Sequence, residues 1–253
     1  MHTTGRQRYT VRWDKAAGHR VRSLHTGGDH TQGPQVVMVP GLGAPGYLLD
    51  ALEGCGAWAE SFLLDVPGFG HRQPRACPAR IPALAGLVSA WLASVPREPV
   101  VLAGHSTGAQ IALRVAAGHP ERVRSLVLMG PTFPPALRRV SGLFGALVRT
   151  LTHESVGELG VTVPYYIRGG VGELFRYVRS ALHDAPERVI GRVACPTLIL
   201  RGAHDAFAPR AWVHRLAATA PHGRSMTVPG AHNFPYRHGG LASALVAEAA
   251  RHR

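Results

Sequence analysis

Short apolar runs alternate along this chain with segments of helical spacing, and that alternation restricts the fold more than any other feature. The runs lie at residues 36–39, 62–64, 100–103, 126–129, 198–200 and 226–228. Each is short, continuous and partly β-branched, which is typical of strands that are buried on both faces. Between them, residues 82–95 repeat apolar side chains every three or four positions, and residues 107–118 are rich in small apolar residues. Strands that alternate with helices predict an α/β protein with a doubly wound, mostly parallel sheet.

The two ends of the chain extend this pattern. Residues 9–13 and 19–24 have the composition of two strands, and we expect an antiparallel hairpin at one edge of the sheet, joined across residues 15–18. Residues 240–252 predict a helix at the end of the chain.

Residues 132–193 interrupt the alternation, because no clear strand occurs there. About 60 residues are too many for a structureless loop in a compact domain. We therefore expect a helical lid inserted after the sixth strand. The predicted core domain is residues 1–131 with 194–253, and the predicted lid is residues 132–193.

Composition excludes several classes of protein. The chain has 253 residues of which 45% are hydrophobic, so it can bury one sizeable core and is not disordered. No apolar run reaches about 18 residues, and residues 1–35 lack the apolar core of a secretory signal, so we expect no membrane partner. Cys55, Cys77 and Cys195 are odd in number and far apart, which favours a reducing compartment and predicts a cytoplasmic protein.

The net charge of +13 makes a nucleic-acid binder a rival interpretation. However, 27 of the 28 basic residues are Arg, Lys15 is the exception, and the arginines are scattered along the chain. This pattern indicates coding bias in a GC-rich genome, so we expect no nucleic-acid partner, although such a surface would attract an anionic substrate.

The GHSTG sequence at residues 104–108 is the sharpest local signal. It follows a predicted strand and opens a predicted helix, as a strained strand-to-helix turn that exposes a nucleophilic Ser requires. Flanking glycines avoid Cβ clashes in such a turn. Ser106 is the predicted nucleophile, and the N–H of Thr107 lies at a helix N-terminus where it can stabilise an oxyanion.

At this point the chain resembles the α/β-hydrolase fold family over nearly its whole length. The resemblance includes residues 39–43 as an oxyanion loop, 64–70 as a D-x-P-G-x-G turn, the Ser106 turn, and the turns at 200–205 and 229–234. It implies a hydrolase with an inserted lid and a second oxyanion donor in the N–H of Leu42. Relatives often carry His where this chain has Pro40, so the loop needs a different brace.

A Ser hydroxyl needs a base, and the base needs an orienting acid. His232 follows a predicted strand and a turn at the same end of the sheet as Ser106. Asp205 follows another strand at that end, although it could instead cap a helix over residues 206–217. The order Ser106, Asp205, His232 is the order that this fold imposes.

Several residues are candidates for binding a substrate. Gly41 and Gly43 belong to the oxyanion loop, and the lid residues Phe144, Tyr165, Tyr166 and Phe175 could line an apolar pocket or only pack the lid onto the body. Arg138, Arg139, Arg168, Arg176 and Arg179 could face an anionic group, but a solvated face is the simpler interpretation.

The predicted function is serine hydrolysis of an ester-type bond (carboxylic ester, lactone or thioester) in a largely apolar small molecule, without a metal or organic cofactor. C–C bond hydrolysis and cofactor-free haloperoxidase-like perhydrolysis use the same constellation and stay open. Epoxide and haloalkane hydrolysis are disfavoured because those relatives have Asp at the position of Ser106. A rival of another class is a slow-turnover small-molecule receptor. The chain is expected to be a monomer or a homodimer.

Overall fold

The computed structural model describes residues 9–30, 32–154 and 156–251, and its centre is one eight-stranded sheet. The strands are β1 (Thr10–Ala16), β2 (His19–Thr26), β3 (Gln35–Val39), β4 (Glu60–Asp65), β5 (Val100–His105), β6 (Val123–Met129), β7 (Thr197–Gly202) and β8 (Gly223–Val228). Their order across the sheet is β1-β2-β4-β3-β5-β6-β7-β8. The pairs β1/β2 and β2/β4 are antiparallel, and all other pairs are parallel. The predicted fold class is confirmed.

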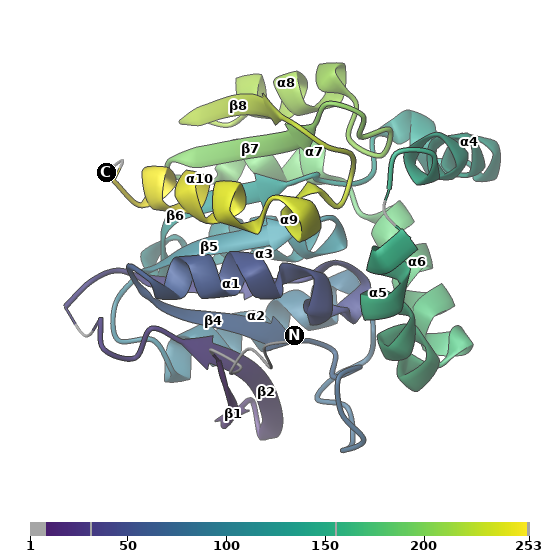
Figure 1. Ribbon diagram of the computed structural model, residues 1–253. Helices are drawn as coiled ribbons and strands as arrows, with labels where there is room; N and C mark the ends of the chain where they lie inside the picture. Colours follow the sequence, from purple (N-terminus) through teal and green to yellow (C-terminus); the bar gives the residue numbers. More distant parts are fainter. Residues whose placement is uncertain (1–8, 31, 155, 252–253) are drawn as a thin grey trace, which may run out of the picture.

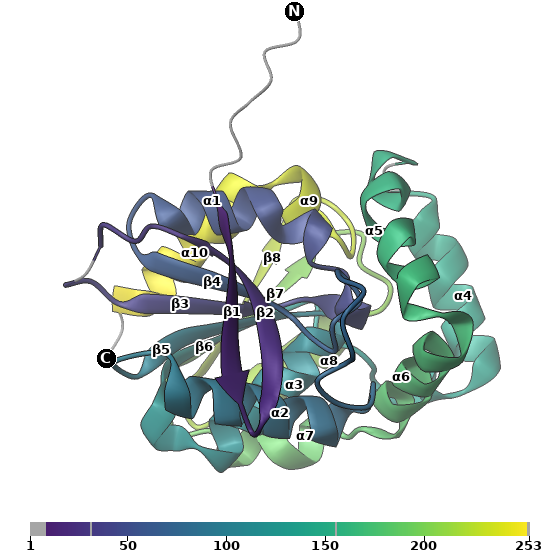
Figure 2. The same cartoon turned by 90° about the horizontal axis from the view of Figure 1, so that it is seen from below.

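Helices cover both faces of the sheet (Figures 1 and 2). One face carries α1 (Leu49–Gly56), α10 (Gly239–Arg251) and the short α9 (Phe234–Arg237). The other carries α2 (Ile81–Ser94), α3 (Thr107–Gly118), the short α7 (Pro186–Val189) and α8 (Arg210–Thr219). Short 3-10 turns occur at Gly41–Gly43, Pro45–Leu48, Pro120–Arg122, Pro135–Arg138 and Ile190–Arg192.

The two helical layers explain why the apolar runs are continuous. In β3, Val36 and Met38 belong to the core beneath α1 and α10, whereas Val37 and Val39 belong to the core beneath α2, α3 and α8. Successive side chains of a strand point to opposite faces, so a strand that is covered twice needs an apolar residue at every position.

The hairpin at the sheet edge has a tighter turn than predicted. Lys15 and Ala16 still belong to β1, and the turn consists of Ala17 and Gly18, with φ of 49° and 79°. Two residues with positive φ match the twist of the flanking strands, which is why this connection is favoured in hairpins.

Three helices replace the strand pattern between β6 and β7: α4 (Val140–Leu151), α5 (Val156–Gly169) and α6 (Val171–His183). They lie together at one side of the sheet (Figure 1, teal to green). No strand occurs among the described residues of 132–193, and we call residues 140–183 the lid helices below. None of the helices in the described ranges is both long and apolar enough to cross a membrane.

Candidate active site

Ser106 occupies a strained turn between β5 and α3. Its φ of 57° and ψ of −122° lie where L-residues are rare. The turn is tight because a Cβ on Gly104 would come within 2.3 Å of the Gly108 carbonyl oxygen, and one on Gly108 within 2.2 Å of the Val39 oxygen. Both glycines are therefore required by close backbone approach, and the strained angles raise Ser106 at the carboxyl end of β5.

Three predicted residues from three strand ends meet at this point. The Ser106 Oγ lies 2.9 Å from Nε2 of His232, which follows β8. The His232 Nδ1 lies 3.0 Å from Oδ2 of Asp205, which follows β7. An ionised carboxylate only accepts, so Nδ1–H donates to Asp205 and Nε2 is left to accept the proton of the Ser106 hydroxyl.

The electrostatics of the pair suit a base and its orienting acid. Burial opposes ionisation of Asp205, but the charge of His232 and the hydrogen bond with it lower the pKa of Asp205. Burial likewise opposes protonation of His232, but the charge and hydrogen bond of Asp205 raise the pKa of His232. The charge of Glu154 adds to that rise. The imidazolium is thus stabilised by two carboxylates.

Asp205 also shapes the turn that carries it. Its Oδ1 accepts the N–H groups of Phe207 and Ala208 at 2.9 and 3.0 Å. Helix α8 begins only at Arg210, so Asp205 is not a helix N-cap and the expected helix over 206–217 starts later than the sequence predicted. One carboxylate oxygen holds the turn and the other holds the imidazole.

A buried relay braces the loop that follows Pro40. The N–H of Gly41 donates to the Tyr47 hydroxyl at 2.7 Å, and this hydroxyl lies 2.8 Å from Nδ1 of His105. The His105 Nε2 lies 2.9 Å from the His232 carbonyl oxygen and must donate to it. Nδ1 therefore accepts from Tyr47. Burial, with the charge of His232, lowers the pKa of His105 to about 3, so the ring is neutral and the direction of the relay is fixed.

The two predicted oxyanion donors are adjacent. The Leu42 N–H donates to Oγ1 of Thr107 at 2.8 Å, and Leu42 has a φ of 46°. The Thr107 N–H belongs to the first residue of α3, where helical N–H groups lack intrahelical partners. The Thr107 hydroxyl thus lies at the position from which it accepts the Leu42 N–H.

A cavity of about 250 Å³ opens beside Ser106 and His232 and is mostly apolar. The predicted residues Gly41, Leu42, Thr107 and Tyr166 line it. The sequence did not single out Tyr47, Thr132, Phe133, Glu158, Leu159, Thr162, Phe207 and Asn233, which line it as well. A Cβ on Gly41 would lie 2.8 Å from the Ser106 Cβ, so Gly41 lets the loop approach the nucleophile.

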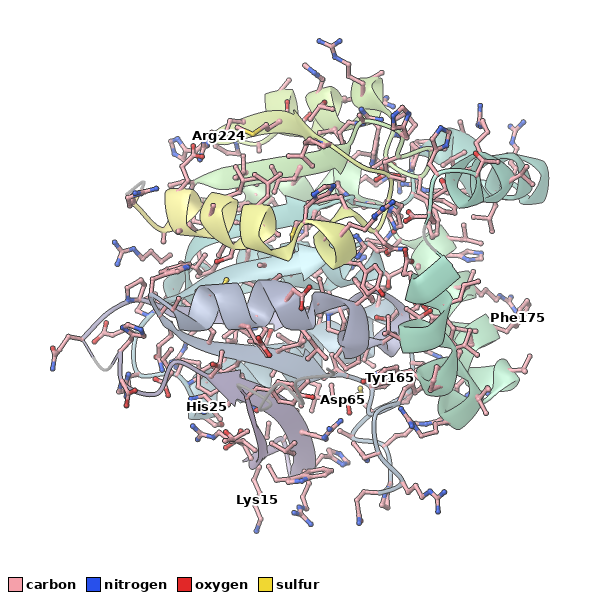
Figure 3. The ribbon with its side chains drawn as sticks, in the orientation of Figure 1. Lys15, His25, Asp65, Tyr165, Phe175 and Arg224 are labelled. Carbon is pink, nitrogen blue, oxygen red and sulfur yellow. The ribbon has the colours of Figure 1, made fainter. Side chains whose placement is uncertain are left out.

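Other predicted substrate residues lie elsewhere. Phe175 is 68% exposed on the outer side of α6 (Figure 3), where it lines a separate groove, so it does not line the cavity. Tyr165 packs near Gly46 and under the Arg168 guanidinium, and Gly43 packs against Phe69. The side chain of Phe144 lies outside the described part of the structure. A one-residue step rotates a helical side chain by about 100°, which separates Tyr165 from Tyr166.

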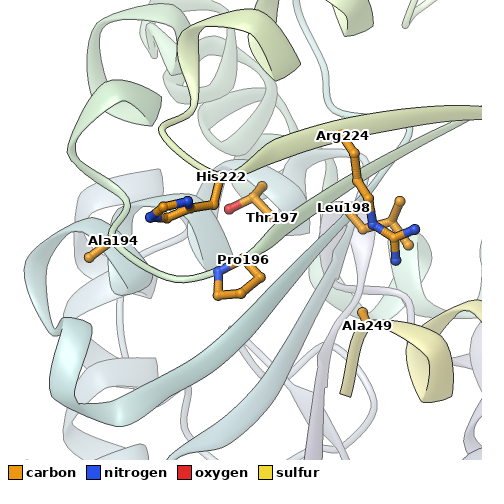
Figure 4. A pocket seen from close by; sticks show the side chains of 7 residues that line it. All are labelled: Ala194, Pro196, Thr197, Leu198, His222, Arg224 and Ala249. Carbon is orange, nitrogen blue, oxygen red and sulfur yellow. The ribbon is translucent and has the colours of Figure 1, made fainter. Parts of the chain in front are cut away.

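A second hollow lies at the opposite edge of the sheet, around His222 and Arg224 at the amino ends of β7 and β8 (Figure 4). Its lining residues include no Asp, Glu, Ser or Cys. Among the described residues, no cluster of three or more His, Cys, Asp or Glu side chains could hold a metal ion.

The chain is similar to known proteins both in sequence and in structure. A family model described as alpha/beta hydrolase fold matches residues 34–154. A pimeloyl-acyl-carrier-protein methyl ester esterase from Chromobacterium violaceum is 30% identical over an alignment of 231 residues that covers 81% of this chain and 89% of that protein. The enol-lactonase from Burkholderia xenovorans LB400 is similar in structure, with a TM-score of 0.73 and 17% identity, covering 94% of this chain and 98% of the other. A membrane phospholipase A, described as a bacterial virulence factor, is also similar in structure, with a TM-score of 0.78 and 19% identity. The match covers 97% of this chain and 87% of the other.

The sheet topology and the esterase relative together define the class of protein as a hydrolase of the doubly wound α/β type. With the family match and the similarity to the Chromobacterium esterase, the chain belongs to the α/β-hydrolase fold family.

Proposed function

We propose that this chain hydrolyses an ester-type bond of a largely apolar acyl substrate through Ser106, His232 and Asp205. The observation that carries the proposal is the 2.9 Å contact between Ser106 Oγ and His232 Nε2 at the strained turn. The chain is an ester-acting hydrolase, in line with its esterase relative.

In the first half-reaction, Ser106 Oγ attacks the carbonyl carbon while His232 Nε2 takes the hydroxyl proton. The carbonyl π-bond opens and its oxygen becomes an oxyanion. When this intermediate collapses, the bond to the leaving group breaks and His232 gives the proton to the departing oxygen or sulfur. The product alcohol or thiol leaves, and the acyl group stays on Ser106.

The oxyanion is stabilised by the N–H groups of Leu42 and Thr107. It replaces the Thr107 hydroxyl as the acceptor of the Leu42 N–H. Each such donor contributes about 2.7–4 kcal/mol to transition-state stabilisation. The relay through Tyr47 holds Gly41, and with it this loop, at a fixed distance from the nucleophile.

In the second half-reaction, water takes the place of the alcohol. His232 accepts its proton and the hydroxide adds to the acyl carbon. On collapse the bond between this carbon and Ser106 Oγ breaks, His232 returns the proton to Oγ, and the carboxylic acid leaves. Asp205 keeps Nδ1 protonated throughout and stabilises the imidazolium in both halves.

The apolar cavity favours an acyl chain, whether the bond is a carboxylic ester, a lactone or a thioester. Its volume of about 250 Å³ fits a small or medium chain. C–C bond hydrolysis, perhydrolysis and a slow-turnover receptor role are the alternatives that substrate profiling separates. The proposal includes a small-molecule substrate, with no nucleic-acid partner, no membrane partner and no cofactor. It also includes a cytoplasmic location and a monomeric or homodimeric protein.

A second candidate is an acyl ester on an acyl-carrier protein, as the name of the Chromobacterium relative suggests. The supporting observation is a groove on the outer side of the lid helices, which we call the basic groove. It is lined by Arg80, Gly172, Phe175, Arg176, Arg179, Ser180 and His183. Cations around an exposed aromatic ring are suited to an acidic partner surface.

The proposal is tested with p-nitrophenyl esters of graded chain length. The wild-type protein should release a burst of p-nitrophenol equal to the enzyme concentration, because acylation precedes slower deacylation. Ser106→Ala should remove the burst and lower turnover by at least about 10⁴-fold while the protein stays folded. Burst release by a folded Ser106→Ala protein would contradict the assignment of the nucleophile.

A further inference from the structure

The peptide unit that follows His232 is held at both of its polar atoms. Its carbonyl oxygen accepts the Nε2–H of His105 at 2.9 Å, and its N–H, which belongs to Asn233, donates to Oε1 of Glu154 at 2.8 Å. A peptide unit is planar, so hydrogen bonds on its two opposite edges fix its orientation. This orientation sets the ψ angle of His232, and with it the position of the imidazole relative to Ser106.

The two hydrogen bonds come from different parts of the molecule. His105 ends β5 in the centre of the sheet, whereas Glu154 belongs to the lid helices and lies just after the end of α4 at Leu151. A hydrogen bond from an N–H to a carboxylate is charge-assisted, and such bonds are about twice as strong as neutral ones. The lid side of this peptide unit is therefore held at least as firmly as the core side.

The same part of the lid makes further contacts with the turns that carry the base and the acid. The Asn233 side-chain amide donates to Oε1 of Glu158, in the first turn of α5. The ring of His153 stacks on that of His204, with centroids 4.5 Å apart and planes 5° apart. His204 lies in the turn of the acid, and its N–H donates to the Gly230 carbonyl oxygen in the turn of the base at 3.0 Å. The lid thus contacts both turns, which are themselves joined.

We propose that Glu154 is a positioning residue for the base, which holds His232 Nε2 within reach of Ser106 Oγ by accepting the Asn233 N–H. This inference rests on the proposed function and gives the lid helices a role in catalysis beyond lining the cavity. Glu154 does not touch the reacting atoms and is not among the residues that line the cavity. Since His232 acts in both half-reactions, the loss of this hold should lower kcat and leave KM unchanged.

The test compares Glu154→Ala with Glu154→Gln. Both variants lose the same charge, but only Gln keeps an oxygen that can accept the Asn233 N–H. On the alkaline plateau of the pH profile, where His232 is neutral in both, kcat for p-nitrophenyl butyrate should be about tenfold lower in Glu154→Ala than in Glu154→Gln, because a small displacement of a catalytic group is costly. The KM values should be alike. Equal kcat values in the two folded proteins would overturn the proposal.

A matched pair of variants separates positioning from general effects of the substitution. Glu121 lies in an exposed turn before β6, with a side chain that is 63% exposed, so Glu121→Ala and Glu121→Gln should both keep the wild-type kcat. If Glu154 only anchored the lid, Glu154→Ala would lower the unfolding temperature and alter KM, while kcat at saturating substrate would match that of Glu154→Gln. That result also counts against the proposal.

A second readout does not depend on turnover. Hydrogen exchange of the Asn233 backbone amide is followed by NMR in the unreactive Ser106→Ala protein, where the bond to Glu154 should slow exchange. Adding Glu154→Ala should speed this exchange by at least about tenfold, whereas adding Glu154→Gln should not. An Asn233 amide that exchanges at the rate of an unstructured peptide already in the Ser106→Ala protein would overturn the proposal, even if Glu154→Ala does not fold.

The two readouts distinguish failure of the positioning role from failure of the proposed function. If the wild type hydrolyses no ester but Glu154→Ala alone speeds the exchange of the Asn233 amide, the proposed function fails and the hold on the base turn stands. If esters are hydrolysed and the Ala and Gln variants agree in kcat and in exchange, the positioning role fails and the proposed function stands.

Discussion

The Tyr47 hydroxyl lies 2.8 Å from Nδ1 of His105. This contact links the oxyanion loop after Pro40 to the residue that precedes the nucleophile, and through His105 to the loop that carries His232. Through it, Gly41 on one side and the His232 carbonyl on the other are tied to one neutral imidazole. The family often uses a His at the position of Pro40 to brace the oxyanion loop. Here a tyrosine from the following turn braces it instead.

Tyr47→Phe should therefore slow catalysis without removing any group that touches the substrate's reacting atoms. The Gly41 N–H and His105 Nδ1 both lose their partner, which should cost about 1–3 kcal/mol in the free energy of unfolding. We expect kcat to fall by about ten- to a hundredfold, because the Leu42 donor is no longer held in place. Steady-state kinetics and urea unfolding measure both effects. Tyr236→Phe, the same change outside this relay, is the control, and an equal effect in the two variants would contradict the relay.

The pH profile should reveal the environment of His232. The base works only when it is neutral, so kcat/KM should fall as the pH drops through its pKa. Because Asp205 raises that pKa, the acid limb should lie above 6.5, the ordinary value for histidine. Glu154→Gln removes a second charge that raises the pKa, so the limb should move to lower pH. A limb that stays in place in this variant would show that Glu154 does not act on His232.

The glycines around Ser106 should be intolerant of even a methyl group. Gly104→Ala would place a Cβ within 2.3 Å of the Gly108 oxygen, and we expect a loss of about 3 kcal/mol or more in unfolding free energy. Gly86→Ala, inside α2 with nothing within 4 Å of the added Cβ, should instead stabilise by about 0.5–1 kcal/mol. Denaturant unfolding of the two variants gives the comparison. A neutral Gly104→Ala would mean that the turn is not as tight as described.

The basic groove should matter only for a substrate carried by a protein. Arg80→Glu with Arg179→Glu should lower kcat/KM for an acyl ester on an acidic carrier protein by at least about tenfold, because reversed charges repel that surface. Hydrolysis of p-nitrophenyl esters should be unchanged, and the wild-type rate on the carrier should fall with added salt. Equal losses on both substrates, or none on the carrier, would remove the carrier protein from the list of candidates.

Much of the fold was predictable because the inner strands β3 to β7 are buried at nearly every position and leave continuous apolar runs. The residues at the strand ends were predictable for a related reason. Parallel strands bring their carboxyl ends to one edge, so Ser106, Asp205 and His232 were expected to meet from sequence positions alone. The structure brings them within hydrogen-bond distance.

The cavity was harder to predict because helical periodicity does not fix which face of a lid helix turns inward. Tyr166 faces the cavity and Phe175 faces solvent, and only the packing of the lid helices against the body decides this. Glu158 was missed for the same reason, whereas Tyr47 was missed because its partner His105 lies far from it in the sequence. Glu158 left one signal, since it is one of only nine Glu in the chain and stands among apolar residues of the lid.

The most direct test of the central claim is labelling with a fluorophosphonate, followed by mapping of the modified peptide. We expect the label on Ser106, and we expect His232→Ala to slow its attachment by at least about a hundredfold, because the hydroxyl loses its base. A label on another residue, or an unchanged rate in a folded His232→Ala protein, would contradict the claim that His232 activates Ser106.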